Sequence, residues 1–304
     1  MVAAATVSPG ELSVASLGAP LDADYEIGSV SKGITGLLYA DACTRGELGP
    51  DTTLGDVLPL GDCPAAGLTL AAVSRHTSGL PGLPRSARPW RRTAAFLLSG
   101  TNPYGETLEE LLAQARTVQL SAPRPRYSNF GFELLGHAVA AGAGMSYRAL
   151  VRERLAAPLG LTSIYMPATA EELGPRAIIG TSRSGRPRQP WTGEALAPAG
   201  GIRSSIGDMA RIVQALLDGT APGQAALDPV ANFAGPAARI GAAWMTLRVK
   251  GRDITWHNGA TGGFRTWTGL DREAGTGVVL LSATAVMVDR QGFRMLRELT
   301  ERVT

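Results

Sequence analysis

The chain has 304 residues, of which 44% are hydrophobic and 18% are charged, and its formal net charge is +3. This is the composition of an ordinary globular protein that can bury a sizeable core. Arginines are scattered along the chain instead of gathering with aromatic residues, so we expect no nucleic-acid binding. No apolar run approaches the length of about 18 residues that would indicate a membrane span.

The ends and the cysteines of the sequence restrict its setting further. Residues 1–5 lack the charged and long apolar regions of a signal peptide, so we expect a cytoplasmic protein. Cys43 and Cys63 could form one bridge, but nothing demands it. Two isolated thiols give neither a metal-binding spacing nor a disulfide framework.

The first elements in the chain are a hairpin and a buried helix. Two short apolar runs, 2–7 and 12–17, flank a turn-like Ser-Pro-Gly-Glu segment and predict two paired strands. Residues 30–42 are apolar nearly all round and predict a central helix that starts directly after Ser29.

Helical patterns then dominate up to about residue 194. The predicted helices are 68–75, 107–115, 130–141 and 147–155, and the segments 79–101 and 178–189 are expected to be irregular loops.

Strands return in the last third of the chain. The patterns predict a helix at 205–217, strands at 242–249, 253–256, 264–270 and 277–283, and a final amphipathic helix at 289–303. Strands at both ends with helices between them indicate an α+β fold. We expect residues 1–45 and 195–304 to form a sheet domain into which a helical domain, 46–194, is inserted.

Ser29 and Lys32 form the first candidate for chemistry. Three residues apart in the first turn of a helix, their side chains share one face. A serine hydroxyl needs a base to become a nucleophile, and a lysine can serve when burial lowers its pKa. The alternative is a helix-capping serine beside a surface lysine. The apolar surroundings of Lys32 favour the reactive pair, because an unpaired buried charge is costly.

Two later segments offer partners for this pair. Tyr127 could relay a proton and Asn129 could orient the lysine and an amide, although packing and helix capping would also explain them. The stretch from His257 through Gly259 to Ala260 follows a strand that we expect to end at Trp256. Its glycines permit close approach of a ligand, and its backbone N–H groups could complete an oxyanion hole. A tight turn between two strands is the alternative.

In this order, Ser-x-x-Lys, Tyr-x-Asn and His-x-Gly resemble the serine β-lactamase and penicillin-binding-protein superfamily, and more narrowly the class C β-lactamase-like serine hydrolases. The segments His-Thr-Ser-Gly-Leu-Pro at 76–81 and Pro-Ala-Gly-Gly-Ile at 198–202 add to the resemblance. It extends over residues 12–303. It implies a β-lactamase/transpeptidase-like fold, with an antiparallel sheet flanked by helices and an inserted, mostly helical domain.

The resemblance also implies roles for matching positions. Ser29 is the expected nucleophile, Lys32 and Tyr127 share general-base and general-acid work, and Asn129 positions Lys32 and substrate.

The third motif has implied roles as well. His257 stands where β-lactamases usually carry a lysine, and it contacts substrate together with Gly259. The backbone N–H groups of Ser29 and Ala260 form the expected oxyanion hole. The resemblance implies neither a metal nor an organic cofactor.

The sequence departs from the family in two ways. The segment before Ser29 is short, so the sheet is expected to be covered differently, and a homodimer could cover it. A histidine at position 257, largely neutral at pH 7, binds the carboxylate of penicillins less well than a lysine.

We therefore predict a serine hydrolase, an esterase or amidase, that acts on a small ester or amide through an acyl-enzyme on Ser29. The alternatives are an acyltransferase or transesterase in metabolite biosynthesis, a β-lactamase or D,D-peptidase, and a non-catalytic binding protein that keeps the fold.

Overall fold

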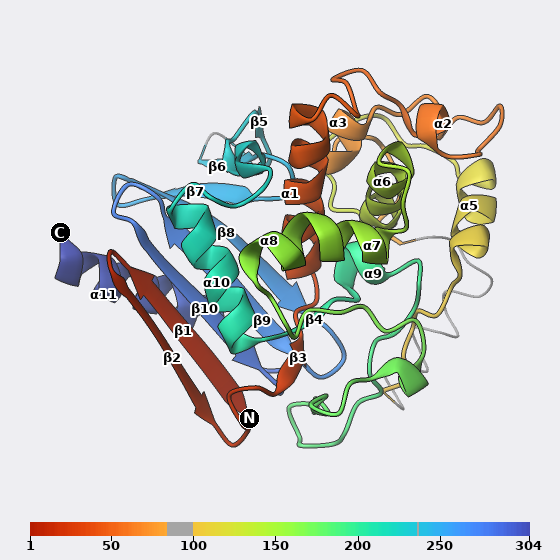
Figure 1. Ribbon diagram of the computed structural model, residues 1–304. Helices are drawn as coiled ribbons and strands as arrows, with labels where there is room; N and C mark the ends of the chain where they lie inside the picture. Colours follow the sequence, from red (N-terminus) through yellow and green to blue (C-terminus); the bar gives the residue numbers. More distant parts are fainter. Residues whose placement is uncertain (84–99, 236) are drawn as a thin grey trace.

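A computed structural model describes residues 1–83, 100–235 and 237–304 (Figure 1). Its centre is an antiparallel sheet with the strand order β2-β1-β10-β9-β8-β7-β6-β5. These strands are β1 (Val2–Ser8), β2 (Glu11–Leu17), β5 (Ala231–Asn232), β6 (Ala238–Ile240), β7 (Met245–Val249), β8 (Arg252–Ala260), β9 (Arg265–Asp271) and β10 (Thr276–Ser282). Because β1 pairs with β10, the N-terminal hairpin extends a sheet whose other strands come from the last third of the chain.

Helices cover both faces of this sheet. The helix α10 (Ile206–Leu217) lies on the same face as α1 (Val30–Thr44), and α11 (Asp289–Val303) lies on the opposite face (Figure 1). Both α10 and α11 contact β10, and every residue of β10 is buried as a result. The predicted hairpin, the predicted helix after Ser29 and the predicted final helix are confirmed.

The chain has further helices and helical turns, most of them beside α1 (Figure 1). They are α2 (Leu54–Val57), α3 (Leu70–Ser74), α5 (Leu108–Thr117), α6 (Asn129–Gly142), α7 (Tyr147–Val151), α8 (Ala157–Leu159), α9 (Ala197–Gly200), the π-helical turn Arg152–Ala156 and the 3₁₀ turns Ala170–Glu172 and Gln224–Leu227. A small second sheet pairs β3 (Asp24–Glu26) with β4 (Arg203–Ser205).

One hydrophobic core joins the sheet to the helices. Its buried members include Ala5 and Val279 from the sheet, Leu37 from α1, and Leu111 and Leu134 from the helical part. The packing is therefore continuous across the expected boundary between the sheet domain and the inserted helical domain.

The structure corrects several predicted elements. The strand expected to end at Trp256 continues as β8 to Ala260, because its last residues pair with β9 up to Arg265. The short strands β5 and β6 were not predicted. The predicted helix 147–155 is divided between α7 and the π-helical turn that follows it.

The structure also bears on the two expected loops and on the two cysteines. Most of the expected loop 79–101 lies outside the described residues. In the other, 178–189, the Ser182 N–H donates to the Arg186 carbonyl over 2.8 Å and closes a tight turn. Cys43 and Cys63 are both free. None of the helices that the structure describes combines the length and apolar character of a membrane-spanning helix.

Candidate active site

Ser29 and Lys32 lie together where α1 begins. Lys32 Nζ donates one hydrogen bond to Ser29 Oγ over 3.1 Å and another to the backbone carbonyl of Ala199. Ser29 is half-buried, whereas Lys32 is 0% exposed. The Ser29 side chain makes no capping hydrogen bond to the helix, so its hydroxyl is not committed to the role that a simple N-cap would have.

Burial changes the acid–base behaviour of Lys32. Loss of water lowers the pKa of its amine from 10.5 to about 7, and the charge of Glu133 opposes this shift. A buried ammonium is disfavoured because the protein interior replaces its hydration poorly. Near neutral pH a large fraction of Lys32 is therefore an unprotonated amine that can accept a proton from Ser29.

The short helix α9 holds the carbonyl that binds Lys32. Thr35 of α1 donates its hydroxyl to the Pro198 carbonyl over 2.7 Å, and the Thr35 and Tyr147 hydroxyls are 2.7 Å apart. These bonds fix α9 against α1. The Ala199 carbonyl thus has a defined place, and it orients the Lys32 amine toward Ser29.

A buried ion network holds the segment that leads to Ser29. Arg203 of β4 pairs with Asp24 and, at 3.2 Å, with Glu26 of β3, and all three side chains are buried. The two segments also contact each other one residue further along, where the Ile27 N–H donates a hydrogen bond to the Ile202 carbonyl over 3.1 Å. The chain before Ser29 is therefore fixed against the segment that contains β4.

Tyr127 reaches the same pair from the segment before α6. Lys32 Nζ lies 4.9 Å from the centroid of the Tyr127 ring. Tyr127 is 41% exposed, but its hydroxyl is turned into the protein. Loss of water around the hydroxyl raises the pKa of the phenol, and a hydrogen bond with Ser29 partly opposes this shift. Tyr127 is a neutral phenol at neutral pH, positioned to exchange a proton with Ser29.

Asn129 lies at the first position of α6, and Ser128 is the residue that caps this helix. The Asn129 amide donates to the Tyr104 hydroxyl over 3.1 Å, and its Oδ1 is buried with no partner among the described residues. Asn129 was expected to position Lys32, but the hydrogen bonds of Lys32 go to Ser29 and Ala199 and not to Asn129. Tyr104 was not predicted, because it lies 25 residues away in an irregular segment.

His257 is buried on β8. Its Nδ1 lies 2.7 Å from the Asn258 carbonyl oxygen. Burial first, and then the positive charge of Lys32, lower the pKa of His257 to about 4. His257 is therefore an uncharged imidazole at neutral pH.

Gly259 and Ala260 bring β8 against the segment before the nucleophile. A Cβ on Gly259 would clash with the Ile27 carbonyl oxygen, and one on Gly28 would lie 2.8 Å from the Ala260 nitrogen. Gly28 also has a φ of +54°, which favours glycine. The backbones around Ser29 and Ala260 are thus in direct contact, as an oxyanion hole made from these two residues requires.

The sequence interpretation assigned no role to two further groups beside the site. Glu133 of α6 is 2% exposed, and its Oε1 has no partner among the described residues. Burial, and then the charge of Glu106, raise its pKa to about 8, while Lys32 opposes the shift. The other is His76, a buried side chain in the segment after α3. The nearly complete burial of α6 is the signal that could have identified Glu133.

Comparison with known proteins agrees with this geometry. The family model described as Beta-lactamase matches residues 2–300. The chain belongs to the β-lactamase family. The family and the fold class that the motif order indicated are thereby confirmed.

Within this β-lactamase family the chain is similar to several described proteins. It is 28% identical to penicillin-binding protein 4 of Amycolatopsis lactamdurans over 82% of this chain and 63% of that protein. It is 26% identical to a beta-lactamase-like protein of Arthroderma benhamiae over 86% of this chain and 49% of that protein. The chain thus spans only about half to two thirds of these relatives.

The fold comparison is more complete. A crystal structure of a class C beta lactamase from Rhodobacter sphaeroides matches with a TM-score of 0.81 and 22% identity, covering 100% of this chain and 95% of that chain. Family and fold are those of serine hydrolases, which supports an enzyme.

Proposed function

We propose that this protein is an esterase or amidase that cleaves a small ester or amide through an acyl-enzyme on Ser29. The observation that carries this proposal is the fully buried Lys32 amine, 3.1 Å from Ser29 Oγ, with its pKa lowered to about 7. A lysine in this state is a base at neutral pH.

The reaction follows from the positions of these groups. Lys32 takes the Ser29 proton as Oγ bonds to the substrate carbonyl carbon, and the carbonyl oxygen becomes an oxyanion facing the N–H groups of Ser29 and Ala260. The leaving alcohol or amine recovers the proton from Lys32, directly or through Tyr127. Water then attacks the acyl-enzyme carbonyl and gives a proton to the same base. The bond between the carbonyl carbon and Oγ breaks, Ser29 Oγ takes that proton back, and the carboxylic acid is released.

His257 supports an ester or amide over a β-lactam. The imidazole is buried and neutral, so this position of the site holds no cation for the carboxylate of a penicillin. A simple ester or amide has no such carboxylate to bind.

Covalent labelling tests the nucleophile. The protein is incubated with a fluorophosphonate, and intact mass is measured for wild type, Ser29→Ala and Ser31→Ala. Ser31 is the matched control, because it lies two residues on, in the first turn of α1, and its hydroxyl accepts a hydrogen bond from the Ile202 N–H. We expect one adduct on wild type and on Ser31→Ala, and none on Ser29→Ala. Equal labelling of Ser29→Ala, or no labelling of wild type, contradicts the assignment.

Substrate assays separate the remaining candidates. We expect short p-nitrophenyl esters to be turned over and penicillin to acylate slowly, whereas rapid penicillin hydrolysis would identify a β-lactamase. Added alcohols or amines distinguish hydrolysis from transfer, because a transferase yields their esters or amides in place of the free acid. A protein that is neither labelled nor active on any of these is a binding protein.

A further inference from the structure

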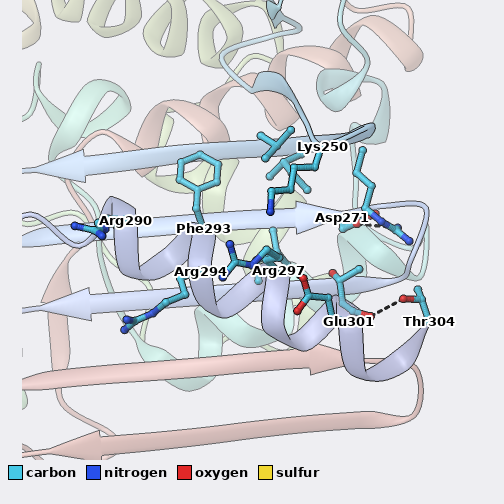
Figure 2. A pocket seen from close by; sticks show the side chains of 13 residues that line it. Lys250, Asp271, Arg290, Phe293, Arg294, Arg297, Glu301 and Thr304 are labelled. Atoms are coloured by element: carbon cyan, nitrogen blue, oxygen red, sulfur yellow. Dashed lines mark hydrogen bonds and ion pairs between the residues drawn. The ribbon is translucent and has the colours of Figure 1, made fainter.

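A hollow lies between α11 and the hairpin of β7 and β8 (Figure 2). Its volume is about 660 Å³. Small-molecule sites occupy about 300–1,000 Å³, so this hollow has room for such a ligand. It lies with α11 on the sheet face opposite α1 (Figure 1), and none of the proposed catalytic residues lines it.

The floor of this hollow is apolar. Ile254 of β8 and Leu296 of α11 are buried in it. Phe293 also lines it and packs edge-on against two tryptophans, with its ring centroid 5.2 Å from that of Trp256 and 4.9 Å from that of Trp267. Such a surface binds an alkyl chain without first having to become ordered.

The rim is strongly cationic. Five basic side chains line it, namely Lys250, Arg252, Arg290, Arg294 and Arg297, against the two acids Asp271 and Glu301. Five minus two leaves +3, as large as the formal charge of the whole chain.

Within the part of the chain that the structure describes, two of these cations have an acidic partner. Arg252 pairs with Asp271 at 3.0 Å, and Arg297 lies 3.6 Å from Glu301. Among the described residues, Lys250, Arg290 and Arg294 form no ion pair.

Lys250 and Arg297 both line this hollow, from different elements. Figure 2 shows both side chains pointing into the hollow from opposite walls, with Phe293 beside them. Lys250 has a φ of +48° at the tip of its hairpin, a conformation that lysine rarely adopts. It is also one of only two lysines in the sequence, the other being Lys32. Lys250 has no acidic partner among the described residues and Arg297 has only the 3.6 Å contact with Glu301, so an anion in the hollow would be attracted to both.

We propose that this hollow binds an amphipathic anion with a single alkyl chain. The chain lies on Phe293, Ile254 and Leu296, and a phosphate or carboxylate head group contacts Lys250 and Arg297. Charge selects the head group and the apolar floor selects the tail, so neither part alone binds well.

Calorimetric titration with decyl phosphate, below its micelle concentration, tests the site. The protein is first blocked at Ser29 with a fluorophosphonate, so that the catalytic site does not contribute. We expect decyl phosphate to bind at least about tenfold more tightly than decanol or inorganic phosphate, because each lacks one half of the recognition. Decanol binding as tightly as decyl phosphate, or decyltrimethylammonium doing so, overturns the proposal.

Variants locate the binding. Lys250→Gln and Arg297→Gln are each expected to raise the Kd for decyl phosphate by about tenfold or more. Arg302→Gln is the matched control, since Arg302 is exposed on α11 but does not line the hollow. All three unblocked variants should keep wild-type ester turnover, which shows that they fold. An unchanged Kd in both Lys250→Gln and Arg297→Gln refutes the site, whatever the outcome at Ser29.

Discussion

The imidazole of His76 lies against the ring of Tyr127, with 4.6 Å between their centroids. His76 Nδ1 accepts a hydrogen bond from the Ser128 N–H over 3.1 Å, and the His76 carbonyl accepts one from the Arg126 N–H over 2.9 Å. His76 therefore contacts three consecutive residues, Arg126, Tyr127 and Ser128, and fixes the position of Tyr127. Burial lowers the pKa of His76 well below 6.5, so the ring is neutral at neutral pH, and the hydrogen bond from the Ser128 N–H makes Nδ1 its acceptor nitrogen.

Loss of this contact should misplace the phenol. We expect His76→Ala to lower kcat/KM on a p-nitrophenyl ester by about 10- to 100-fold and to cost about 1–3 kcal/mol in the free energy of unfolding, because a buried N–H loses its acceptor. His76→Asn should retain more of both, since asparagine offers an acceptor and tolerates the φ of +59° at this position.

The pH profile separates positioning from catalysis. His76 titrates well below neutral pH, so the midpoint of the rate profile should be the same in His76→Asn as in wild type. A shifted midpoint would mean that His76 itself exchanges the proton.

The Ser29 and Lys32 pair was predictable from the sequence, because the order of the motifs and the apolar helix after Ser29 both indicated it. Periodicity located α1, and the burial of α1 is what brings Lys32 into the interior. The contacts made by distant segments were out of reach. The Ala199 carbonyl that binds Lys32 lies 167 residues away, and only packing of α9 against α1 brings it there.

Two errors have a local cause. Glycine is rare in strand interiors, so the glycine-rich stretch after Trp256 indicated a strand end. In the fold, Gly259 permits β8 to run past the Ile27 carbonyl and remain paired with β9. The strands β5 and β6 have only two and three residues, too few to show an alternating pattern.

The rate should depend on pH through Lys32. Its pKa of about 7 means that raising the pH converts the ammonium into the amine, so kcat/KM should rise with a midpoint near pH 7. Lys32→Arg should be inactive at every pH, because a guanidinium does not deprotonate. Lys250→Gln, which removes the only other lysine, should leave the midpoint unchanged.

Glu133 should influence that midpoint. The ionised form of Glu133 raises the pKa of Lys32, but with its own pKa at about 8 the carboxyl is mostly protonated at pH 7. Glu133→Gln is therefore expected to move the midpoint of the kcat/KM profile only slightly, and to lower pH. The exposed Glu109 on α5 serves as the control, and Glu109→Gln should leave the profile unchanged. A midpoint that moves upward in Glu133→Gln would show that Glu133 does not act through its charge.

Stability should also depend on Glu133. The pKa of this carboxyl is about 8 in the folded protein against 4.5 for an ordinary glutamate. A group with a raised folded pKa stabilises the fold most below pH 4.5, and the contribution is lost as the pH rises toward 8. Glutamine mimics the protonated acid at every pH. Thermal unfolding should therefore show Glu133→Gln to be more stable than wild type by about 1–3 kcal/mol at pH 8, with a smaller difference at pH 5. The opposite order at pH 8 would indicate that Glu133 is held as an ion pair.

Gly259 should be needed both for folding and for chemistry. A methyl group there would meet the Ile27 carbonyl and the Thr266 hydroxyl, which are bonded to each other over 2.8 Å. We expect Gly259→Ala to lose about 1–3 kcal/mol of unfolding free energy, because the backbones must separate to admit the methyl group. The same separation moves Ala260 away from Ser29, so labelling by a fluorophosphonate should slow under conditions in which the variant is still folded. Gly67→Ala is the control, since a Cβ at Gly67 would meet no atom within 4 Å. Normal labelling of folded Gly259→Ala would show that the contact between these two backbones is not required for acylation.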